Sequence, residues 1–274
     1  MSNKNIAKKE ILMTSITDVD NLRKYLEQKG KNHRNYKSYS SQKFIEEVIN
    51  EQRIYLNDGS NWNDIKDRKG FNSENSEVRN FGKCFSYSDN ESIAMWMLYG
   101  GIDNRGAMIN FTQKDMKKIM EIKEIILGKF ENGRFVEYKR LDKSKFTIQL
   151  IDVLYIREKN GKYCARRNTE VCKEVEADLI KKLGSMCVKD IAWCYENECR
   201  LVISVNKKYV GEETVVKLDI SAMELTESYN KVYHSPTFKG ERKYEDSELQ
   251  GYVDWNLCSN CEVRLKNEFM EINC

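Results

Sequence analysis

Apolar residues in this chain come in short segments, and that spacing constrains the fold more than any other feature. No unbroken run of 18 apolar residues occurs among the 274 residues, so no membrane-spanning helix is expected. Segments with the composition of strands lie at 53–56, 83–88, 106–112, 199–205, 214–220 and 261–265. Segments with helical character lie at 19–29, 41–52, 90–100, 113–127 and 169–186.

Strands and helices mixed in this way predict an α+β fold with a mixed or antiparallel central sheet and flanking helices. We expect a single domain over 1–274, with a motif-bearing core at about 40–205 and a C-terminal extension over 206–274. The polar stretch 65–80 is expected to be a loop, and 128–140 to be irregular or rich in strands.

The charge balance excludes a strongly basic nucleic-acid binder, because 46 Lys and Arg face 43 Asp and Glu and the net charge is only +3. Basic doublets with tyrosines nearby suggest either a track for a nucleic-acid strand or ordinary solvated surface. The doublets are Lys139-Arg140, Arg166-Arg167, Lys181-Lys182 and Lys207-Lys208. The charged N-terminal residues contain no secretion signal, so we expect a cytoplasmic protein whose nine cysteines are mostly reduced.

Several kinds of catalytic site are excluded by the residues available. His33 and His234 are the two histidines, so a three-histidine metal site is impossible. Neither a phosphate-binding loop, a dinucleotide-binding glycine turn nor a GxSxG serine motif occurs. The CSNC motif joins Cys258 and Cys261, but a structural zinc needs two more ligands, and no standard spacing supplies them. No metal is expected.

The segment IAWCYENECRLVISV (191–205) places charged residues at the mouth of an apolar strand. On a strand, Glu196, Glu198 and Arg200 would point to the same side because they are two residues apart. This face is either a surface ladder of ion pairs or a site. In a site, Arg200 would keep one carboxylate ionised, and the other would engage a substrate hydroxyl or a developing positive charge.

Two further segments carry polar residues at the edges of apolar elements. NWND (61–64) follows a predicted strand and offers Asn63 and Asp64 as substrate-binding residues. In FSYSDNES (85–92), Ser86 and Ser88 leave a strand and are expected to enter the start of a helix with Asp89 as its N-cap. Backbone N–H groups at such a helix start favour an anion.

Together, the three segments resemble a bacterial family of unknown function, DUF2971. Its members look like FNDPxE, then FSxSxxxxxMWxxYxxxxxGxxIxF, then KxxxWxYExExR. The counterparts are WND (62–64), FSYSDNESIAMWMLYGGIDNRGAMINF (85–111) and KDIAWCYENECRL (189–201), and the resemblance covers about 40–205. The first motif departs from the family, because Ile65 and Lys66, with Asp67 following, stand where its proline and final glutamate are usual.

The Ser-x-Ser and Glu-x-Glu segments also resemble those of ADP-ribosyltransferases of the Arg–Ser–Glu type. That resemblance implies a split central sheet and NAD as the co-substrate. It implies that Ser86 and Ser88 support the NAD pocket and that Arg53 supplies the family's arginine from an early strand. Tyr87, Trp96 or Tyr99 would stack on nicotinamide.

The same resemblance assigns roles to the two glutamates. Glu198 would bond the ribose 2′-hydroxyl and stabilise positive charge at the anomeric carbon. Glu196 would orient or deprotonate the acceptor. Breaking the nicotinamide–ribose bond in this way requires a placed carboxylate rather than a metal or a histidine.

The sequence therefore predicts an NAD-dependent ADP-ribosyltransferase that modifies an intracellular macromolecule, with nucleic acid slightly favoured over protein. Such an enzyme would act as a toxin or anti-phage effector and would need an antitoxin or similar inhibitor as its partner. Three alternatives stay open: an NAD glycohydrolase, a non-catalytic binding module of a defence system, and a nuclease. In the nuclease, Asp64, Glu196 and Glu198 would collect Mg²⁺.

Overall fold

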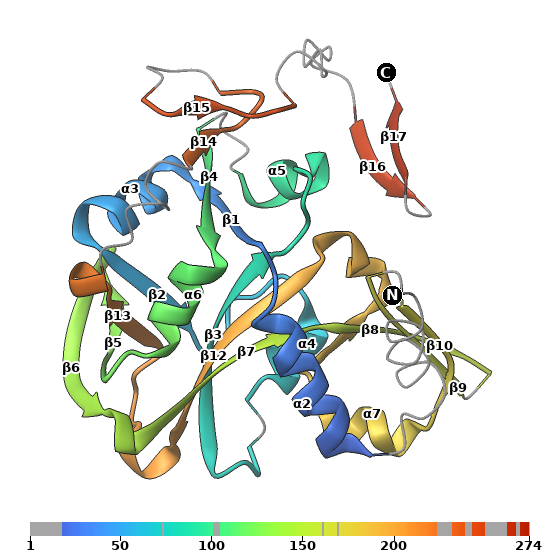
Figure 1. The fold of residues 1–274 in the computed structure, drawn as a ribbon, viewed down its shortest axis with the longest axis horizontal. Coiled ribbons are helices and arrows are strands. Elements are labelled where there is room, and N and C mark those ends of the chain that lie inside the picture. The colour runs from blue at the N-terminus through green and yellow to red at the C-terminus, as the bar shows by residue number, and fades with distance from the viewer. Residues whose placement is uncertain are drawn as a thin grey trace, which may run out of the picture.

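The computed structural model describes residues 18–72, 74–100, 105–160, 162–168, 170–223, 232–238, 243–249, 262–266 and 269–273. These residues form an α+β fold built around a large mixed sheet. Figure 1 shows a second, smaller sheet beside α7 (Ala177–Leu183), at the opposite side of the molecule from the edge strand β6 (Arg134–Asp142). The expected fold class is confirmed.

Within the described residues, the large sheet has eleven strands. Besides β6 they are β1 (Asn35–Ser41), β2 (Arg53–Asn57), β3 (Val78–Ser86), β4 (Gly106–Thr112), β5 (Glu124–Glu131), β7 (Phe146–Asp152), β12 (Glu198–Asn206), β13 (Val215–Asp219), β14 (Val232–His234) and β15 (Glu245–Asp246). The described part of the second sheet contains β8 (Leu154–Lys159), β9 (Lys162–Arg167), β10 (Glu170–Val175) and β11 (Val188–Asp190). Strands β16 (Glu262–Lys266) and β17 (Phe269–Asn273) pair as a separate hairpin.

The large sheet forks at β3. One edge of β3 pairs with β12 along its length, from Ser86 opposite Glu198 to Val78 opposite Asn206. The other edge meets β1 at Ser86 and β2 at Gly82. Beyond β3 the sheet therefore divides into a branch that continues through β4 and a branch that continues through β13 and β5 (Figure 1).

Helices cover the sheets and connect their strands. Besides α7, they are α2 (Val19–Gly30), α3 (Gln42–Glu51), α4 (Ile65–Gly70), α5 (Ile93–Tyr99) and α6 (Gln113–Met120). Short 3₁₀ helices form η1 (Lys143–Lys145), η2 (Ile191–Glu196), η3 (Lys207–Tyr209) and η4 (Ser221–Met223). Within the described chain, no helix combines the length and apolar character needed to cross a membrane.

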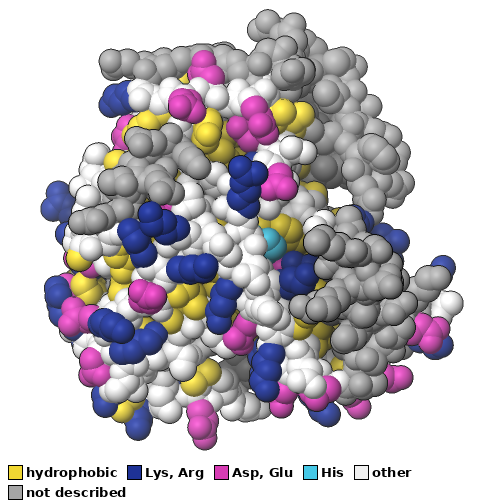
Figure 2. All heavy atoms as spheres, viewed as in Figure 1, with side chains coloured by type: hydrophobic (Ala, Val, Ile, Leu, Met, Phe, Trp, Pro, Cys, Tyr) yellow, Lys and Arg dark blue, Asp and Glu magenta, His cyan; other side chains and the backbone are white. Residues whose placement is uncertain are grey.

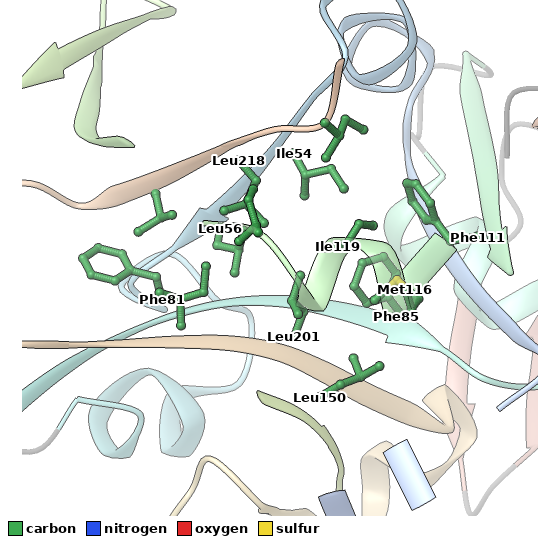
Figure 3. Packing of buried hydrophobic residues seen from close by; sticks show 14 of the residues in the cluster. Ile54, Leu56, Phe81, Phe85, Phe111, Met116, Ile119, Leu150, Leu201 and Leu218 are labelled. Carbon is green, nitrogen blue, oxygen red and sulfur yellow. The ribbon is translucent and has the colours of Figure 1, made fainter. Parts of the chain in front are cut away.

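The main hydrophobic core lies against the forked sheet. Phe81 and Phe85 of β3, Leu201 of β12, and Met116 and Ile119 of α6 belong to one buried cluster (Figure 3). Because side chains alternate along a strand, Ser86 and Glu198, which are neighbours of Phe85 and Cys199, lie on the face of the sheet away from this core. That other face carries the polar residues.

Two predicted helices are partly wrong because long-range pairing overrides local pattern. In the segment 113–127, helix α6 ends at Met120, and β5 begins at Glu124. The buried residues that start at Ile125 lie between β13 and β6. A strand at this place forms hydrogen bonds with the backbone N–H and C=O groups of both neighbours. In the segment 169–186, β10 pairs with β9 before the short helix α7 begins.

Other boundaries also differ from the sequence-based expectation. The stretch 65–80 contains α4 and the start of β3 rather than only a loop. Ser92, not Asp89, caps α5, because the Ser92 hydroxyl accepts the N–H of Met95. Strand β13, which belongs to the segment 206–274, lies between β2 and β5 inside the large sheet.

Gly30 allows α2 to pack directly on β7. A Cβ atom at this position would lie 2.5 Å from the backbone oxygen of Leu150. We expect Gly30→Ala to lower the free energy of unfolding by about 1–3 kcal/mol, because backbone cannot move aside as a side chain can. Urea denaturation measures the change. Gly211→Ala is the control, because the nearest atom to its Cβ is the end of the Glu213 side chain at 3.3 Å. Equal losses in the two variants would contradict this account.

Candidate functional site

A cavity of about 330 Å³ lies where the sheet forks. Its walls come from β1, β2 and β3, from the loop 57–64, and from α4 and α5. Lys189, Glu196 and Glu198 also line it, and they come from β11, η2 and the first residue of β12. Residues separated by more than a hundred positions therefore meet around one pocket.

The two glutamates reach this pocket from different elements. Glu196 is the last residue of η2, and Glu198 is the first residue of β12. Asn197 between them adopts a left-handed conformation, with φ of 44°, which asparagine tolerates better than most residues. The expectation that Glu196, Glu198 and Arg200 share one strand face is therefore wrong for Glu196. The reversal at Asn197 brings Glu196 back beside Glu198.

These side chains are not a surface ladder of ion pairs. Glu196, Glu198 and Arg200 are 3%, 2% and 0% exposed. The guanidinium of Arg200 donates to Glu198 Oε1 at 2.6 Å through Nε and to Asp67 Oδ2 at 2.5 Å through Nη2. Its Nη1 donates to the carbonyl of Ser185 at 2.6 Å. A fully buried arginine is stable only when its charge and its donors are satisfied in this manner.

Lys189 is the second buried cation of the site. Its ammonium group donates to Glu196 Oε2 at 2.5 Å and to Glu198 Oε2 at 3.1 Å, and it lies 3.8 Å from Asp67 Oδ2. The indole ring of Trp193 lies 4.8 Å from the same nitrogen. Two cations and three carboxylates thus form one buried network.

The surroundings of the two glutamates shift their pKa values in opposite directions. Burial and the neighbouring charge of Glu198 raise the pKa of Glu196 to about 7, although Lys189 and the Tyr99 hydroxyl act in the opposite direction. Burial also opposes ionisation of Glu198, but Arg200 and Lys189 outweigh it and hold the pKa of Glu198 well below its usual range. Near neutral pH, Glu198 is an anion and Glu196 exchanges a proton.

Hydroxyl groups fix the orientation of both glutamates. Tyr99 of α5 donates its hydroxyl hydrogen to Glu196 Oε1 at 2.6 Å. The backbone N–H of Glu198 donates to the hydroxyl oxygen of Tyr155 at 2.8 Å. Both tyrosines are expected to stay protonated, because burial and the nearby glutamates raise the pKa of each.

Several residues singled out from the sequence do line the cavity. Besides the two glutamates, Ser86, Tyr99, Asn63 and Asp64 lie in its wall. Asp64 is also the N-cap of α4, because its Oδ1 accepts the backbone N–H of Lys66. Ser86 faces the pocket from β3 and not from a helix start, because α5 begins seven residues later.

Other expected cofactor-binding residues lie elsewhere. Tyr87 points to the opposite side of the strand and stacks on His33, with ring centroids 4.0 Å apart. Trp96 is buried and donates its indole N–H to Glu91 at 2.7 Å, as a core residue does. Arg53 pairs with Glu51 at 3.0 Å outside the cavity wall. Ser88 lies beyond the end of β3 and outside the wall.

Arg200 is also absent from the cavity wall and lies beneath the floor, so it supports Glu198 rather than touching a ligand.

Three residues of the network were not predicted from the sequence: Asp67, Lys189 and Tyr155. Lys189 begins the KDIAWCYENECRL segment, so the motif did carry a signal for it. Asp67 follows Asp64 by one helical turn, but helix α4 was not expected. Tyr155 carries no sequence signal, because only the docking of the second sheet brings its hydroxyl to Glu198.

A separate cluster forms on the other side of β12. His33, Asp152 and Cys199 place potential metal-ligating atoms within 4.8 Å of one another. However, Asp152 Oδ1 is bonded to His33 Nε2 at 2.6 Å, and Asp152 Oδ2 accepts from Arg167 at 2.7 Å. With a guanidinium already on this carboxylate, we interpret the cluster as a structural ion pair. Cys258 and Cys261 lie outside the described residues.

The basic doublets do not join into one track. Lys139 pairs with Glu213, and Arg140 pairs with Glu124 of β5 and Glu137 of β6. Arg167 is buried against Asp152. Lys181 lies on α7, and Lys207 lies on η3 at the far end of β12. Figure 2 shows acidic side chains interspersed among the basic ones on the face in view.

Removing the buried guanidinium should leave Glu198 and Asp67 without their main counter-charge. We expect Arg200→Met to lower the free energy of unfolding by about 3–5 kcal/mol. Arg53→Met is the matched control, because its exposed pair with Glu51 should contribute less than about 1 kcal/mol. Chemical denaturation of both variants tests the difference, and a mild effect at Arg200 would refute the buried network.

The raised pKa of Glu196 makes stability depend on pH. Between pH 4.5, where the unfolded side chain titrates, and about 7, the folded state retains a proton that the unfolded chain has lost. The free energy of unfolding of the wild type, relative to Glu196→Gln, should therefore fall as pH rises through this window and level off above it. Urea titrations of both proteins at several pH values measure the slope. A rising difference would show that Glu196 is instead held ionised.

One family model matches part of the chain. Residues 95–201 match the model of a family described as a protein of unknown function, DUF2971. No curated protein and no solved structure matches the chain. The matched range is narrower than the expected 40–205, but it runs from α5 into β12 and includes both glutamates. The comparison therefore supports the resemblance to DUF2971 over the segment that supplies Tyr99, Lys189 and the carboxylate pair.

Proposed function

We propose that the cavity binds NAD and that the protein is an ADP-ribosyltransferase. The observation that carries this proposal is the pair of buried glutamates held in different charge states at the cavity floor. Carboxylate pairs whose surroundings separate their pKa values are typical of acid–base and glycosyl-transfer sites. The match to DUF2971 names no reaction and is neutral on this point.

The chemistry follows from the two charge states. The bond between ribose C1′ and the nicotinamide nitrogen breaks, and its electron pair leaves with nicotinamide. Positive charge then develops at C1′, and ionised Glu198 stabilises it. An oxygen or nitrogen atom of the acceptor forms the new bond to C1′, and its proton passes to Glu196, whose pKa of about 7 suits a general base at neutral pH.

The volume and lining of the cavity suit one half of a dinucleotide. Its volume of about 330 Å³ is at the lower end of the range for small-molecule sites. Tyr55 and Trp62 offer aromatic surface. Lys37 and Lys83 lie on the wall formed by β1 and β3, and burial lowers the pKa of both lysines. We place nicotinamide riboside inside, with the phosphates toward the lysines.

The alternative of a metal-dependent nuclease is less compatible with the network. Glu198 and Asp67 are already bonded to Arg200, and Lys189 is bonded to both glutamates. A Mg²⁺ ion would have to enter beside these two cations, and Asp64 already caps α4. The charge arrangement therefore favours glycosyl chemistry over a carboxylate-bound metal.

An ADP-ribosyltransferase of this kind would also serve the wider role expected from the sequence. A transferase that modifies nucleic acid or protein inside its own cell would act as a toxin or anti-phage effector, and an inhibitor protein would have to restrain it. With water as the acceptor, the same site would be an NAD glycohydrolase.

The test uses NAD radiolabelled in either the nicotinamide or the adenylate half, incubated with purified protein and a cell lysate containing EDTA. Wild type should release nicotinamide and transfer the adenylate label to a macromolecule. Glu198→Gln should slow nicotinamide release by about a hundredfold or more, the usual loss when a group that stabilises transition-state charge is removed. Glu212→Gln, an exposed glutamate with 88% of its side chain accessible, is the matched control.

Each other outcome has a defined meaning. Nicotinamide release without a labelled macromolecule would replace the transferase with a glycohydrolase. No release at all would remove both NAD activities and leave a binding module. Degradation of nucleic acid in the absence of EDTA but not in its presence would favour the nuclease instead.

A further inference from the structure

Lys189 and Tyr155 reach the same glutamate from the second sheet. They lie opposite each other on the paired strands β11 and β8. The Lys189 ammonium donates to Glu198 Oε2 at 3.1 Å, and the Tyr155 hydroxyl accepts the backbone N–H of Glu198 at 2.8 Å. The docked second sheet therefore holds both the carboxylate and the backbone of Glu198.

Lys189 differs from Arg200 in the partners that it contacts. Arg200 bonds to Glu198 and Asp67. Lys189 bonds to Glu198 and also to Glu196. Among the ion pairs that the structure describes, Lys189 is the cation paired with Glu196, and its side chain is 8% exposed. Screening by water is therefore weak, and this charge acts on both carboxylates at short range.

We propose that Lys189 is the positioning residue of this site, and that its ammonium group fixes Glu198 as the anion while it keeps Glu196 able to release its proton. It needs no contact with a ligand to do so. This inference rests on the proposed function only for its activity measurement. The ionisation of the two glutamates is tested without it.

The other groups around Glu196 cannot replace this charge. Tyr99 of α5 contributes one neutral hydrogen bond, and Tyr195 on η2 is uncharged. Glu198 of β12 repels a second negative charge. Around the ammonium itself lie Asp67 of α4, the Cys84 thiol of β3, Arg200 of β12 and the Trp193 ring. Without Lys189, burial and Glu198 would keep Glu196 protonated well above neutral pH.

The first experiment follows the side-chain carboxyl carbons of ¹³C-glutamate-labelled protein by NMR as pH is varied. The midpoint for Glu196, assigned with Glu196→Gln, should lie near 7 in the wild type. In Lys189→Met it should rise by about one pH unit or more, because an opposite charge at this range has been removed. Lys189→Arg should restore the wild-type midpoint. Lys66→Met, which removes an 82%-exposed lysine paired with Asp190, should leave it unchanged.

The activity measurement adds a test that a purely structural role would not pass. The acidic limb of the pH profile for nicotinamide release should move to higher pH in Lys189→Met, together with the NMR midpoint. If the wild type releases no nicotinamide, the proposed function fails, but the NMR titration still decides the role of Lys189.

A measurement on the wild type covers the case in which Lys189→Met does not fold. The ¹⁵Nζ signal of Lys189 should change with the same midpoint as the Glu196 carboxyl carbon, because the two groups share a hydrogen bond. A Lys189 signal that ignores the Glu196 titration would overturn the proposal. An unchanged Glu196 midpoint in a folded Lys189→Met protein would overturn it equally.

Discussion

Arg200 places a full positive charge where water does not reach, and the rest of the site depends on how that charge is compensated. Its partners come from α4, from β12 and from the loop before β11. Removing such a charge from water costs several kcal/mol, which is offset only when every partner is in position. The pocket therefore exists only when the forked sheet, α4 and the second sheet have packed together.

Lys189 extends this network to Glu196. The two glutamates have the same side chain but contact different numbers of cations, and they therefore ionise at different pH. Glu198 contacts both cations and remains ionised, whereas Glu196 contacts one and titrates near neutral pH. Burial alone would raise the pKa of both. The chemical asymmetry of the site is thus a consequence of geometry, and the proposed division of labour between the glutamates follows from it.

The fork of the sheet explains why a pocket forms at this place. Strand β3 is fully paired with β12 on one edge but meets β1 and β2 only at Ser86 and Gly82 on the other. Two branches that separate from one strand leave a gap, and the loop 57–64 and α5 border it rather than fill it. Gly82 suits the loop's close approach, because a Cβ there would lie 3.0 Å from the ring of Trp62.

The spacing of apolar residues correctly predicted those helices and strands that show a regular apolar period within their own sequence. The helix near 41–52 and the strands near 106–112 and 199–205 lie where apolar spacing placed them. Apolar spacing did not predict the structure of 113–127, where a strand follows a short helix, or of 169–186, where a strand precedes one. In both places hydrogen bonds to a partner strand decide the structure, and a local window contains no information about that partner.

For the site, the sequence by itself determined which residue types were available: two glutamates, an arginine and a lysine within one motif, and too few histidines for a three-histidine metal site. Only the tertiary structure decided that Glu196 lies on a 3₁₀ turn, that Asp67 and Tyr155 complete the network, and that Tyr87, Trp96 and Arg53 lie outside the pocket. The reason is physical. Residue type fixes what a side chain can donate, accept or titrate, whereas burial and charged neighbours, which fix what it does, are set by chain segments far away in sequence.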